Sequence, residues 1–590
     1  MTLTAALTNL RKKPADAPAF PVVLACGFTP LHLATFFEAY LQAAMPGHAV
    51  RVSGGLYGDL IGTVESLSES PAHAAAIAVE WQDLDPRLGF RNAAAWRPAD
   101  VEDILSSVER SLRRLEGALH AIARVIRIAV SSPTLPLPPV FYSPPWLAAE
   151  PELHLFELLA ETFRRVSALS NVSVLNSRKI DLLSPPGSRH DLKSDLFTGL
   201  PYTLTHADIL AGALAGLIHP AAPMKGLITD LDDTLWKGIL GDAGVENVAW
   251  DLDSHARIHG LYQQVLCALT GQGVLIGCAT KNDPAIVETA LARPDILLPR
   301  DTVFPVEAGW GAKSAAIAGI LKIWNIGADS VVFVDDSPME LAEVQQAFPS
   351  MHCLRFPKDD YVAAAPFLAD LRGRFGKAGI TREDTIRRDS IRQGAELQRL
   401  AEAIASTPGA FRSASETFLM DMRARIVIDF ETAPDDPRVL ELVNKTNQFN
   451  LNGIRYTEAE WRAEIDGPGA FAASIAYEDR FGPLGKIAVV AGRRIGRTLH
   501  IPVWVMSCRA FARRIEHQCI RQLLDRFEVD SIEFRFVPTP RNGPLRDLFR
   551  AIAGDPVPQP FHLGRELFDS KCPALYHEVK ILRPAGVSLG

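Results

Sequence analysis

The fourteen residues from Lys225 to Gly238 read KGLITDLDDTLWKG. A short apolar run leads into two aspartates, Asp230 and Asp232, which stand two residues apart. This pattern predicts a buried strand that delivers acidic side chains at its carboxyl end, where open α/β sheets place their sites. Side chains two residues apart on a strand share a face, so both carboxylates can converge on one ligand. Two close carboxylates need a cation or a proton between them. The alternative interpretation of the two aspartates is a solvated acidic loop after a strand.

The composition excludes several classes of protein. A chain of 590 residues exceeds one hydrophobic core, so we expect three or four domains. Its net charge of −8 gives no reason to expect nucleic-acid binding. Seven cysteines without CxxC spacing favour reduced thiols over disulfides or a structural zinc site. We find no signal-peptide pattern and no apolar run of transmembrane length, so we expect a cytoplasmic protein without membrane contact.

Residues 1–220 alternate strand-like and helix-like stretches, which predicts an α/β domain with a parallel sheet. After the first strand-like run, Gly27-Phe28-Thr29 resembles the first block of the SGNH-hydrolase-like fold, with Thr29 where that fold carries its nucleophilic Ser. His206 and Asp208 are candidates for a base and its orienter, but here the Asp follows the His instead of preceding it. We therefore interpret this domain as a non-catalytic recognition domain.

Four polar motifs follow in order within residues 221–372, which we predict to form a Rossmann-like α/β domain. The motifs are Asp230-Leu231-Asp232-Asp233-Thr234, Thr280, Lys313 and Asp335-Asp336. Phosphoryl transfer through an aspartyl intermediate requires these residue types: a carboxylate nucleophile, an acid/base neighbour, donors for the phosphoryl oxygens and ligands for a divalent cation. An oxygen-only ligand set beside a substrate phosphate suits Mg²⁺.

The four motifs resemble those of the haloacid dehalogenase (HAD) phosphatase superfamily. The wording ITDLDDTLWKGILGDAG (228–244), ATKND (279–283) and FVDDSPME (333–340) resembles its FkbH-like branch. The resemblance implies that Asp230 attacks phosphorus and that Asp232 protonates the leaving oxygen and then activates water. It also implies that Thr280 and Lys313 hold the phosphoryl group.

The same resemblance implies a Mg²⁺ site and substrate contacts. The implied metal ligands are the Asp230 carboxylate, the Asp232 backbone carbonyl, Asp335 and Asp336. The implied substrate-binding residues are Thr234, Trp236, Lys281, Asn282 and Arg509. For Trp236, packing is the alternative to stacking on a substrate.

The spacing of the motifs predicts an open site. About fifty residues separate the first motif from Thr280, and about thirty separate Thr280 from Lys313. Neither gap holds a sizeable cap domain in addition to a strand and a helix. A site without its own lid suits a large substrate, such as a group carried on a phosphopantetheine arm. It equally fits a capless phosphatase that acts on any bulky phosphoester.

Members of the FkbH-like family are associated with loading a glyceryl unit from 1,3-bisphosphoglycerate onto an acyl carrier protein in polyketide assembly, with loss of phosphate. The resemblance implies a thiol that takes the acyl group first. Family sequences often read Cys-Ser-Lys-Asn-Asn where this chain has Ala279-Thr280-Lys281-Asn282-Asp283, so Cys278 lies one residue upstream of the family position. On a strand, that shift turns the side chain to the opposite face. Cys278 is therefore either a nucleophile or a small buried hydrophobe.

We predict a helical linker over residues 373–415, with a junction at 406–415, and a strand-dominated α+β domain over residues 416–590. Two segments, 441–461 and 505–517, resemble the GNAT-like domain that ends many FkbH-like proteins. Arg509 keeps the first position of the turn that holds coenzyme A pyrophosphate in working acetyltransferases, but Ala512 and Arg514 replace its small residues. We therefore interpret this domain as a substrate- or carrier-binding module. Its density of Asn residues fits polar ligand contact or turn formation.

Three functions stay open on this evidence. The first is Mg²⁺-dependent dephosphorylation of a three-carbon acyl donor coupled to loading of an acyl carrier protein. The second is a Mg²⁺-dependent phosphatase acting on another phosphoester. The third is acyl transfer from coenzyme A through the GNAT-like domain.

Overall fold

The computed structural model of the protein describes residues 1–12, 17–69, 72–91, 97–141, 143–144, 146–377, 380, 384, 387–388, 391–392, 420–446, 449–480, 482–507, 510, 513–539 and 542–582. The predicted linker over 373–415 lies largely outside these residues, and so does Arg509. The chain divides into two compact units, residues 1–221 and residues 222–590. The second unit contains two separate sheets. In the part of the chain that the structure describes, every helix is too short or too polar to cross a membrane.

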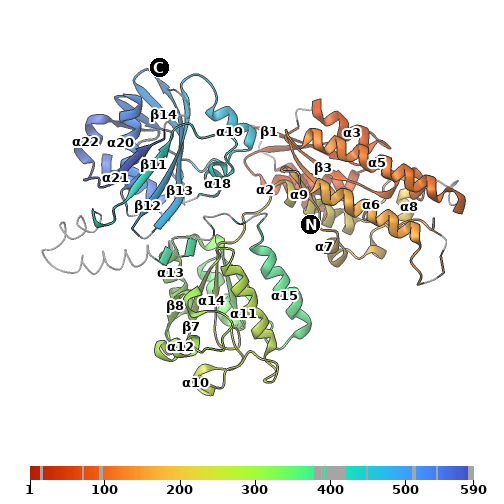
Figure 1. Ribbon diagram of the computed structural model, residues 1–590, viewed down its shortest axis with the longest axis horizontal. Coiled ribbons are helices and arrows are strands. Elements are labelled where there is room, and N and C mark those ends of the chain that lie inside the picture. The colour runs from red at the N-terminus through yellow and green to blue at the C-terminus, as the bar shows by residue number, and fades with distance from the viewer. Residues whose placement is uncertain are drawn as a thin grey trace, which may run out of the picture. The chain divides into compact units, whose positions relative to one another are not determined.

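The first unit is built on a five-stranded parallel sheet in the order β2-β1-β3-β4-β5. Its strands are β1 (Ala19–Ala25), β2 (Ala49–Gly54), β3 (Ala74–Ala78), β4 (Arg127–Ser131) and β5 (Val172–Val174). Its helices are α1 (Leu3–Arg11), α2 (Leu31–Ala44), α3 (Leu60–Ser66), α4 (Trp81–Leu84), α5 (Val101–Ile122), α6 (Glu150–Val166), α7 (Ser177–Leu183), α8 (Leu192–Thr198) and α9 (Leu204–Ile218). Alternate residues of β1 face opposite cores, one with α1, α2 and α9 and the other with α3, α5 and α6. Helices thus cover both faces of the sheet, as a parallel α/β domain requires (Figure 1).

The second unit begins with another five-stranded parallel sheet, in the order β10-β9-β6-β7-β8. Its strands are β6 (Gly226–Thr229), β7 (Leu275–Thr280), β8 (Val303–Ala308), β9 (Val331–Asp335) and β10 (His352–Arg355). Its helices are α10 (Leu240–Ala243), α11 (Arg257–Thr270), α12 (Pro284–Leu291), α13 (Lys313–Trp324), α14 (Pro338–Ala347) and α15 (Tyr361–Arg374). Helices α11, α12 and α15 pack on one face, and α13 and α14 pack on the other. Between β6 and β8 the chain holds α10, α11, β7, α12 and one short 3₁₀ helix (Arg300–Thr302), so no cap domain is inserted there.

The rest of the second unit is a seven-stranded mixed sheet in the order β16-β15-β14-β13-β12-β11-β17. Its strands are β11 (Arg425–Asp429), β12 (Ala470–Asp479), β13 (Gly482–Ile495), β14 (Thr498–Met506), β15 (Ser531–Phe534), β16 (Phe561–Gly564) and β17 (Glu578–Ile581). Its helices are α18 (Pro437–Lys445), α19 (Glu458–Ile465), α20 (Ile515–Phe527), α21 (Gly543–Ala553) and α22 (Arg565–Lys571). Helices α18 and α19 cover one face, and α20, α21 and α22 cover the other (Figure 1).

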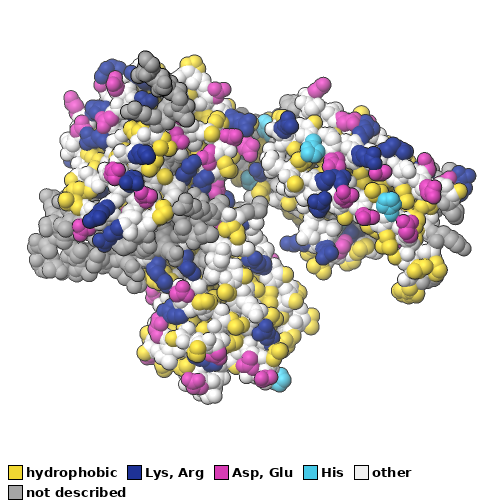
Figure 2. Space-filling view, viewed as in Figure 1, with side chains coloured by type: hydrophobic (Ala, Val, Ile, Leu, Met, Phe, Trp, Pro, Cys, Tyr) yellow, Lys and Arg dark blue, Asp and Glu magenta, His cyan; other side chains and the backbone are white. Residues whose placement is uncertain are grey.

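Charged side chains of both signs are interspersed over the face seen in Figure 2. On that face the described Lys and Arg side chains gather into no continuous basic stripe of the kind that tracks a nucleic-acid backbone.

A buried polar chain crosses the core of the first unit. His206 is fully buried on α9, and its two ring nitrogens lie 2.9 Å from the Thr134 and Ser184 hydroxyl oxygens. The Thr134 hydroxyl donates its hydrogen to Glu80, so its oxygen must accept from His206 Nε2–H. Burial lowers the pKa of His206 to about 3, and the Arg189 charge acts in the same direction. His206 is therefore a neutral structural side chain.

Asp208 does not orient His206. Its carboxylate binds the amino group of Met1 at 2.6 Å and the Tyr40 hydroxyl at 2.9 Å. Thr29 donates its hydroxyl hydrogen to the Thr198 carbonyl. The hydrogen-bond partners of Thr29, His206 and Asp208 thus differ, and the non-catalytic role of the first domain stays a prediction.

The neutral state of His206 predicts that the first unit loses stability in acid. Because the folded-state pKa lies below the unfolded value of 6.5, the unfolded chain binds a proton first as pH falls. We expect this contribution to be complete above pH 6.5 and to decline down to about pH 3. Hydrogen exchange of α9 in the full chain, compared at pH 7 and pH 4.5, checks this. In His206→Gln the difference between the two pH values should shrink, and an unchanged difference would contradict the assignment.

Candidate active site

Three of the predicted strand-end residues meet at one edge of the second sheet. Asp230 directly follows β6, Thr280 is the last residue of β7, and Asp335 is the last residue of β9. Strand β6 lies between β7 and β9, and all three run parallel, so their carboxyl ends share an edge. Lys313 is the first residue of α13, which begins at the same edge after β8.

The Lys313 ammonium lies among three carboxylates. Nζ is 2.8 Å from Asp230 Oδ1 and 2.5 Å from Asp335 Oδ2, and it also contacts Glu340 Oε2. Lys313 is 3% exposed and Asp335 is fully buried, so water screens these charges weakly. Lys313 thus supplies the cation that the buried Asp230 and Asp335 carboxylates require.

Burial sets the protonation behaviour of this cluster. It raises the pKa of Asp230 to about 7, against the lowering influence of Lys313, and the nearby Asp335 charge raises it further. Burial likewise raises the pKa of Asp335 to about 6. Burial alone would lower the pKa of Lys313, but the Asp230 and Asp335 carboxylates together hold it above its ordinary value. The lysine is therefore a permanent cation next to carboxylates that depend on it to ionise.

Asp232 lies beside this cluster and is held by three donors. Its Oδ1 accepts hydrogen bonds from Trp236 Nε1 and from the Leu240 amide, each at 3.1 Å. Its Oδ2 accepts one from Asn282 Nδ2 at 3.0 Å. The same Asn282 nitrogen lies 3.0 Å from Thr280 Oγ1. Asp232 is half-buried, whereas Trp236 is fully buried and therefore cannot stack on a substrate.

The remaining predicted residues divide between the site and its surroundings. Lys281 pairs with Glu340 at 2.9 Å, which links it to Lys313. Thr234 is fully buried, and its hydroxyl has no hydrogen-bond partner among the described residues. Asp336 pairs instead with Lys358 at 2.7 Å, and the same lysine contacts Asp233 at 2.8 Å.

The structure supplies a different third acid for a metal. The carboxylates of Asp230, Asp335 and Glu340 lie within 4.8 Å of one another, and Asp336 does not belong to this group. Hard carboxylate oxygens in such a group suit Mg²⁺. Glu340 lies in the first turn of α14, five residues after Asp335. An acid in the first turn of the helix that follows a motif strand was the sequence signal that could have identified Glu340. Lys358 was missed because it follows β10, a strand that the sequence pattern did not predict.

Cys278 faces the apolar core. It lies on β7, is fully buried, and packs in the cluster formed by α11, α12 and α15. Burial, with the Asp230 charge next in importance, raises the pKa of its thiol well above the ordinary range. A reactive thiol needs exposure and a lowered pKa. The structure therefore favours the small buried hydrophobe over the nucleophile.

The Asn-rich segment of the last domain has structural partners. Leu451 N donates to the Trp504 carbonyl, and Val537 N donates to the Leu451 carbonyl, so this segment lies between β14 and the chain after β15. Asn450 Oδ1 accepts from the amides of Asn452 and Gly453, which closes a turn. These bonds account for Asn450 as a turn residue.

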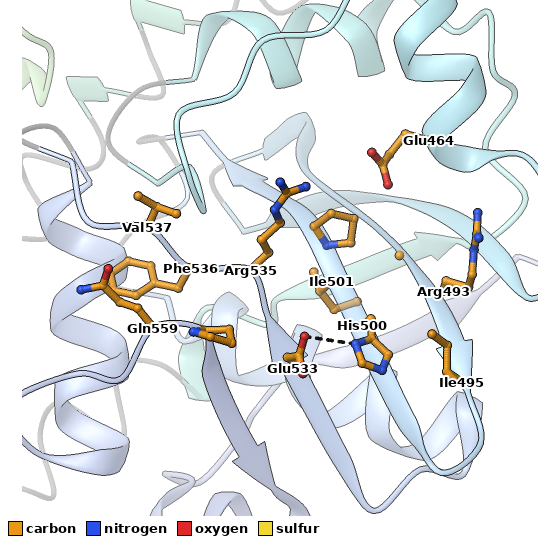
Figure 3. A pocket seen from close by; sticks show the side chains of 13 residues that line it. Glu464, Arg493, Ile495, His500, Ile501, Glu533, Arg535, Phe536, Val537 and Gln559 are labelled. Atoms are coloured by element: carbon orange, nitrogen blue, oxygen red, sulfur yellow. Dashed lines mark hydrogen bonds and ion pairs between the residues drawn. The ribbon is translucent and has the colours of Figure 1, made fainter. Parts of the chain in front are cut away.

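A separate cavity of about 650 Å³ opens on the C-terminal sheet (Figure 3). Its lining includes Arg493, His500, Glu533 and Arg535, and His500 Nδ1 lies 3.2 Å from Glu533 Oε1. None of the predicted site residues that the structure describes lines it.

Comparisons with known proteins do not assign an activity to this chain. No protein-family model matches the sequence, and no curated protein matches it. Among solved structures, the chain is similar to the N-terminal part of the protein BF1531 from Bacteroides fragilis, which contains a phosphatase domain and was crystallised as a complex with Mg. That similarity has 19% identity and a TM-score of 0.49 over 62% of this chain and 98% of the other. An uncharacterized protein from Corynebacterium glutamicum is similar at 17% identity, with a TM-score of 0.19, over 26% of this chain and 98% of the other. Neither likeness is strong enough to assign an activity to this chain.

The cluster around Lys313 predicts a large and coupled stability effect. Lys313→Met should lower stability by about 3–5 kcal/mol, because it leaves buried carboxylates without their cation. Adding Asp230→Asn to Lys313→Met should recover part of this loss, because one uncompensated charge is then removed. Thermal melting of the four members of this double-mutant cycle at pH 7 measures the coupling.

Lys358→Met is the matched control for this cycle. Lys358 also contacts two aspartates, but its side chain is 34% exposed, so we expect a loss of about 1 kcal/mol or less. Equal losses in the two lysine variants would contradict the special role of the buried cation.

Proposed function

We propose that residues 222–377 catalyse phosphoryl transfer through an aspartyl intermediate, in the manner of a HAD-type phosphatase. The observation that carries this proposal is the contact of Lys313 Nζ with Asp230 and Asp335, with Asp232 held at the same edge of the sheet. A buried cation beside a nucleophilic carboxylate supplies the charge that a phosphoryl group needs as it is transferred.

The reaction follows from these positions. An Asp230 carboxylate oxygen attacks phosphorus while the bond from phosphorus to the leaving oxygen breaks, and Asp232 gives that oxygen a proton. Asp232 then takes a proton from water as the water oxygen attacks phosphorus, and the bond to Asp230 breaks to release phosphate. Lys313 and Thr280 hold the phosphoryl oxygens.

Mg²⁺ fits the carboxylates of Asp230 and Asp335, with the Asp232 carbonyl as the expected third protein ligand, and it would neutralise phosphoryl charge as a Lewis acid. Glu340 is a further acid within reach of the same position.

The open edge of the site guides the choice of substrate. Because no cap domain is inserted between β6 and β8, a bulky phosphoester can approach Asp232, which is half-buried. We propose that this substrate is a phosphorylated three-carbon acyl donor similar to 1,3-bisphosphoglycerate. The glyceryl-type unit would pass to the phosphopantetheine thiol of an acyl carrier protein, as the FkbH-like wording of the motifs implies.

The burial of Cys278 bears on the route of this acyl transfer. With Cys278 inaccessible, we propose that the carrier thiol loses its proton and attacks the acyl carbon directly, so that a thioester forms while the bond from that carbon to the 1-phosphate breaks. The Asp230 reaction would remove the 3-phosphate, which leaves a glyceryl unit on the carrier. The SGNH-like and GNAT-like domains would then contribute recognition. A phosphatase acting on another phosphoester, and acyl transfer from coenzyme A through residues 416–590, are the alternatives.

Substitution of the two motif aspartates tests the phosphatase proposal. Asp230→Asn should lower phosphate release by about 10³-fold or more, because no phosphoenzyme can form. Asp232→Asn should lower it by about 10²–10⁴-fold, because the phosphoenzyme then lacks the base that activates water. Phosphate release from p-nitrophenyl phosphate with Mg²⁺ measures both, and chelation with EDTA should abolish the wild-type rate.

Asp295→Asn is the control, because Asp295 pairs with Arg293 on the surface of the same domain. Wild-type activity in Asp230→Asn would refute the proposed nucleophile.

Carrier loading tests the finer proposal. We expect the full chain, incubated with 1,3-bisphosphoglycerate, Mg²⁺ and a phosphopantetheinylated carrier from the same gene neighbourhood, to add a glyceryl mass to the carrier. Cys278→Ala should load the carrier at the wild-type rate, because its thiol is buried. Intact-protein mass spectrometry measures the product. If phosphate is released but the carrier gains no mass, the loading reaction is contradicted and the phosphatase proposal stands.

A further inference from the structure

Asp232 is held in one orientation by two side chains whose roles differ. The Trp236 indole and the Leu240 amide both donate to Oδ1, whereas only the Asn282 amide donates to Oδ2. Oδ1 therefore faces two N–H donors that belong to the loop following Asp232. Oδ2 is the oxygen on the side of Thr280, because Asn282 bridges Asp232 and Thr280.

The loop geometry fixes the Trp236 contact. Asp233 adopts a left-handed conformation with φ of +51°, and its carboxylate accepts from the Gly238 amide at 2.9 Å. This tight turn folds the chain back so that Trp236, four residues after Asp232, returns to its carboxylate. Trp236 is fully buried, so its N–H would lose a hydrogen bond without replacement by water if Asp232 turned away.

The contact of Asn282 with Asp232 Oδ2 differs from the Trp236 contact because its donor is shared. Asn282 is 4% exposed, and its one amide nitrogen serves both Asp232 Oδ2 and Thr280 Oγ1. A leaving-group oxygen that approaches Oδ2 can displace this shared donor without leaving Asn282 unpaired, because Thr280 retains it. Among the residues that the structure describes, the two donors on Oδ1 contact no such second acceptor.

We infer that Trp236 and Asn282 are positioning residues for proton transfer by Asp232: Trp236 fixes Oδ1, and Asn282 keeps Oδ2 directed toward the reacting side. Oδ2 is then the oxygen that passes the proton to the leaving group. This inference rests on the proposed phosphatase function. It adds which oxygen of Asp232 transfers the proton and which two side chains orient that oxygen.

The test compares two substrates that differ in their need for a proton. The leaving group of p-nitrophenyl phosphate departs readily without one, whereas the alkoxide of glycerol 3-phosphate requires one. In Trp236→Phe, which keeps the ring but loses the N–H, kcat/KM for glycerol 3-phosphate should fall about tenfold more than for p-nitrophenyl phosphate. Asn282→Leu should shift the ratio in the same direction, together with a loss on both substrates through Thr280.

Trp250→Phe is the matched control. Trp250 is a buried tryptophan of the same core, and its indole N–H donates to the Asp295 carbonyl instead of to Asp232. Its substitution should leave the ratio of the two kcat/KM values at the wild-type level. Melting temperatures of the variants separate losses of folding from losses of catalysis.

The outcomes are distinguishable. A Trp236→Phe variant that lowers both substrates equally, with its melting temperature unchanged, overturns the inference while the phosphatase stands. If Trp236→Phe does not fold, Asn282→Leu decides, and an unchanged ratio in it overturns the inference. A wild-type protein that releases phosphate from neither substrate overturns the proposed function and the inference with it.

Discussion

The buried ammonium of Lys313 is the interaction on which the central domain depends. A lysine that is 3% exposed is unfavourable unless carboxylates surround it, and the buried acids Asp230 and Asp335 are unfavourable without a cation. The parallel sheet resolves both problems, because it brings the ends of β6 and β9 and the start of α13 to one edge. Burial raises the pKa of Asp230 to about 7, and the Lys313 charge opposes this rise. The same contacts thus organise the edge and place a cation where the proposed reaction would bring a phosphoryl group.

The sequence allowed prediction of the residues that lie at the ends of strands. Asp230, Thr280 and Asp335 each follow an apolar run, and the carboxyl ends of parallel strands must meet. Prediction failed where an element is short. Strand β10 has only four residues, none of them buried, so its pattern is weak, and Lys358 after it was missed.

Depth below the strand end and the path of one loop explain the two residues whose interpretation changed most between sequence and structure. Cys278 and Thr280 are two apart on β7, yet Thr280 is the last residue of the strand, beside the open edge, while Cys278 lies deeper among apolar side chains. Distance from the strand end, more than the face of the strand, separates a buried hydrophobe from a site residue here. Trp236 is both packing and polar contact: its ring fills the core while its N–H reaches Asp232. No periodicity in the sequence predicts this bond, because it depends on the left-handed turn at Asp233.

An open edge places a particular demand on Asp232. Enzymes with lids complete their catalytic geometry when the lid closes and excludes water. Residues 226–377 hold no inserted cap, so the acid/base residue that we propose at this edge must be oriented before the substrate arrives. Three donors around Asp232, one of them the buried indole of Trp236, meet this demand from within the domain. Preorganisation of this kind replaces the closure of a lid with donors that are already in place, and it suits the bulky phosphoester that we propose as the substrate.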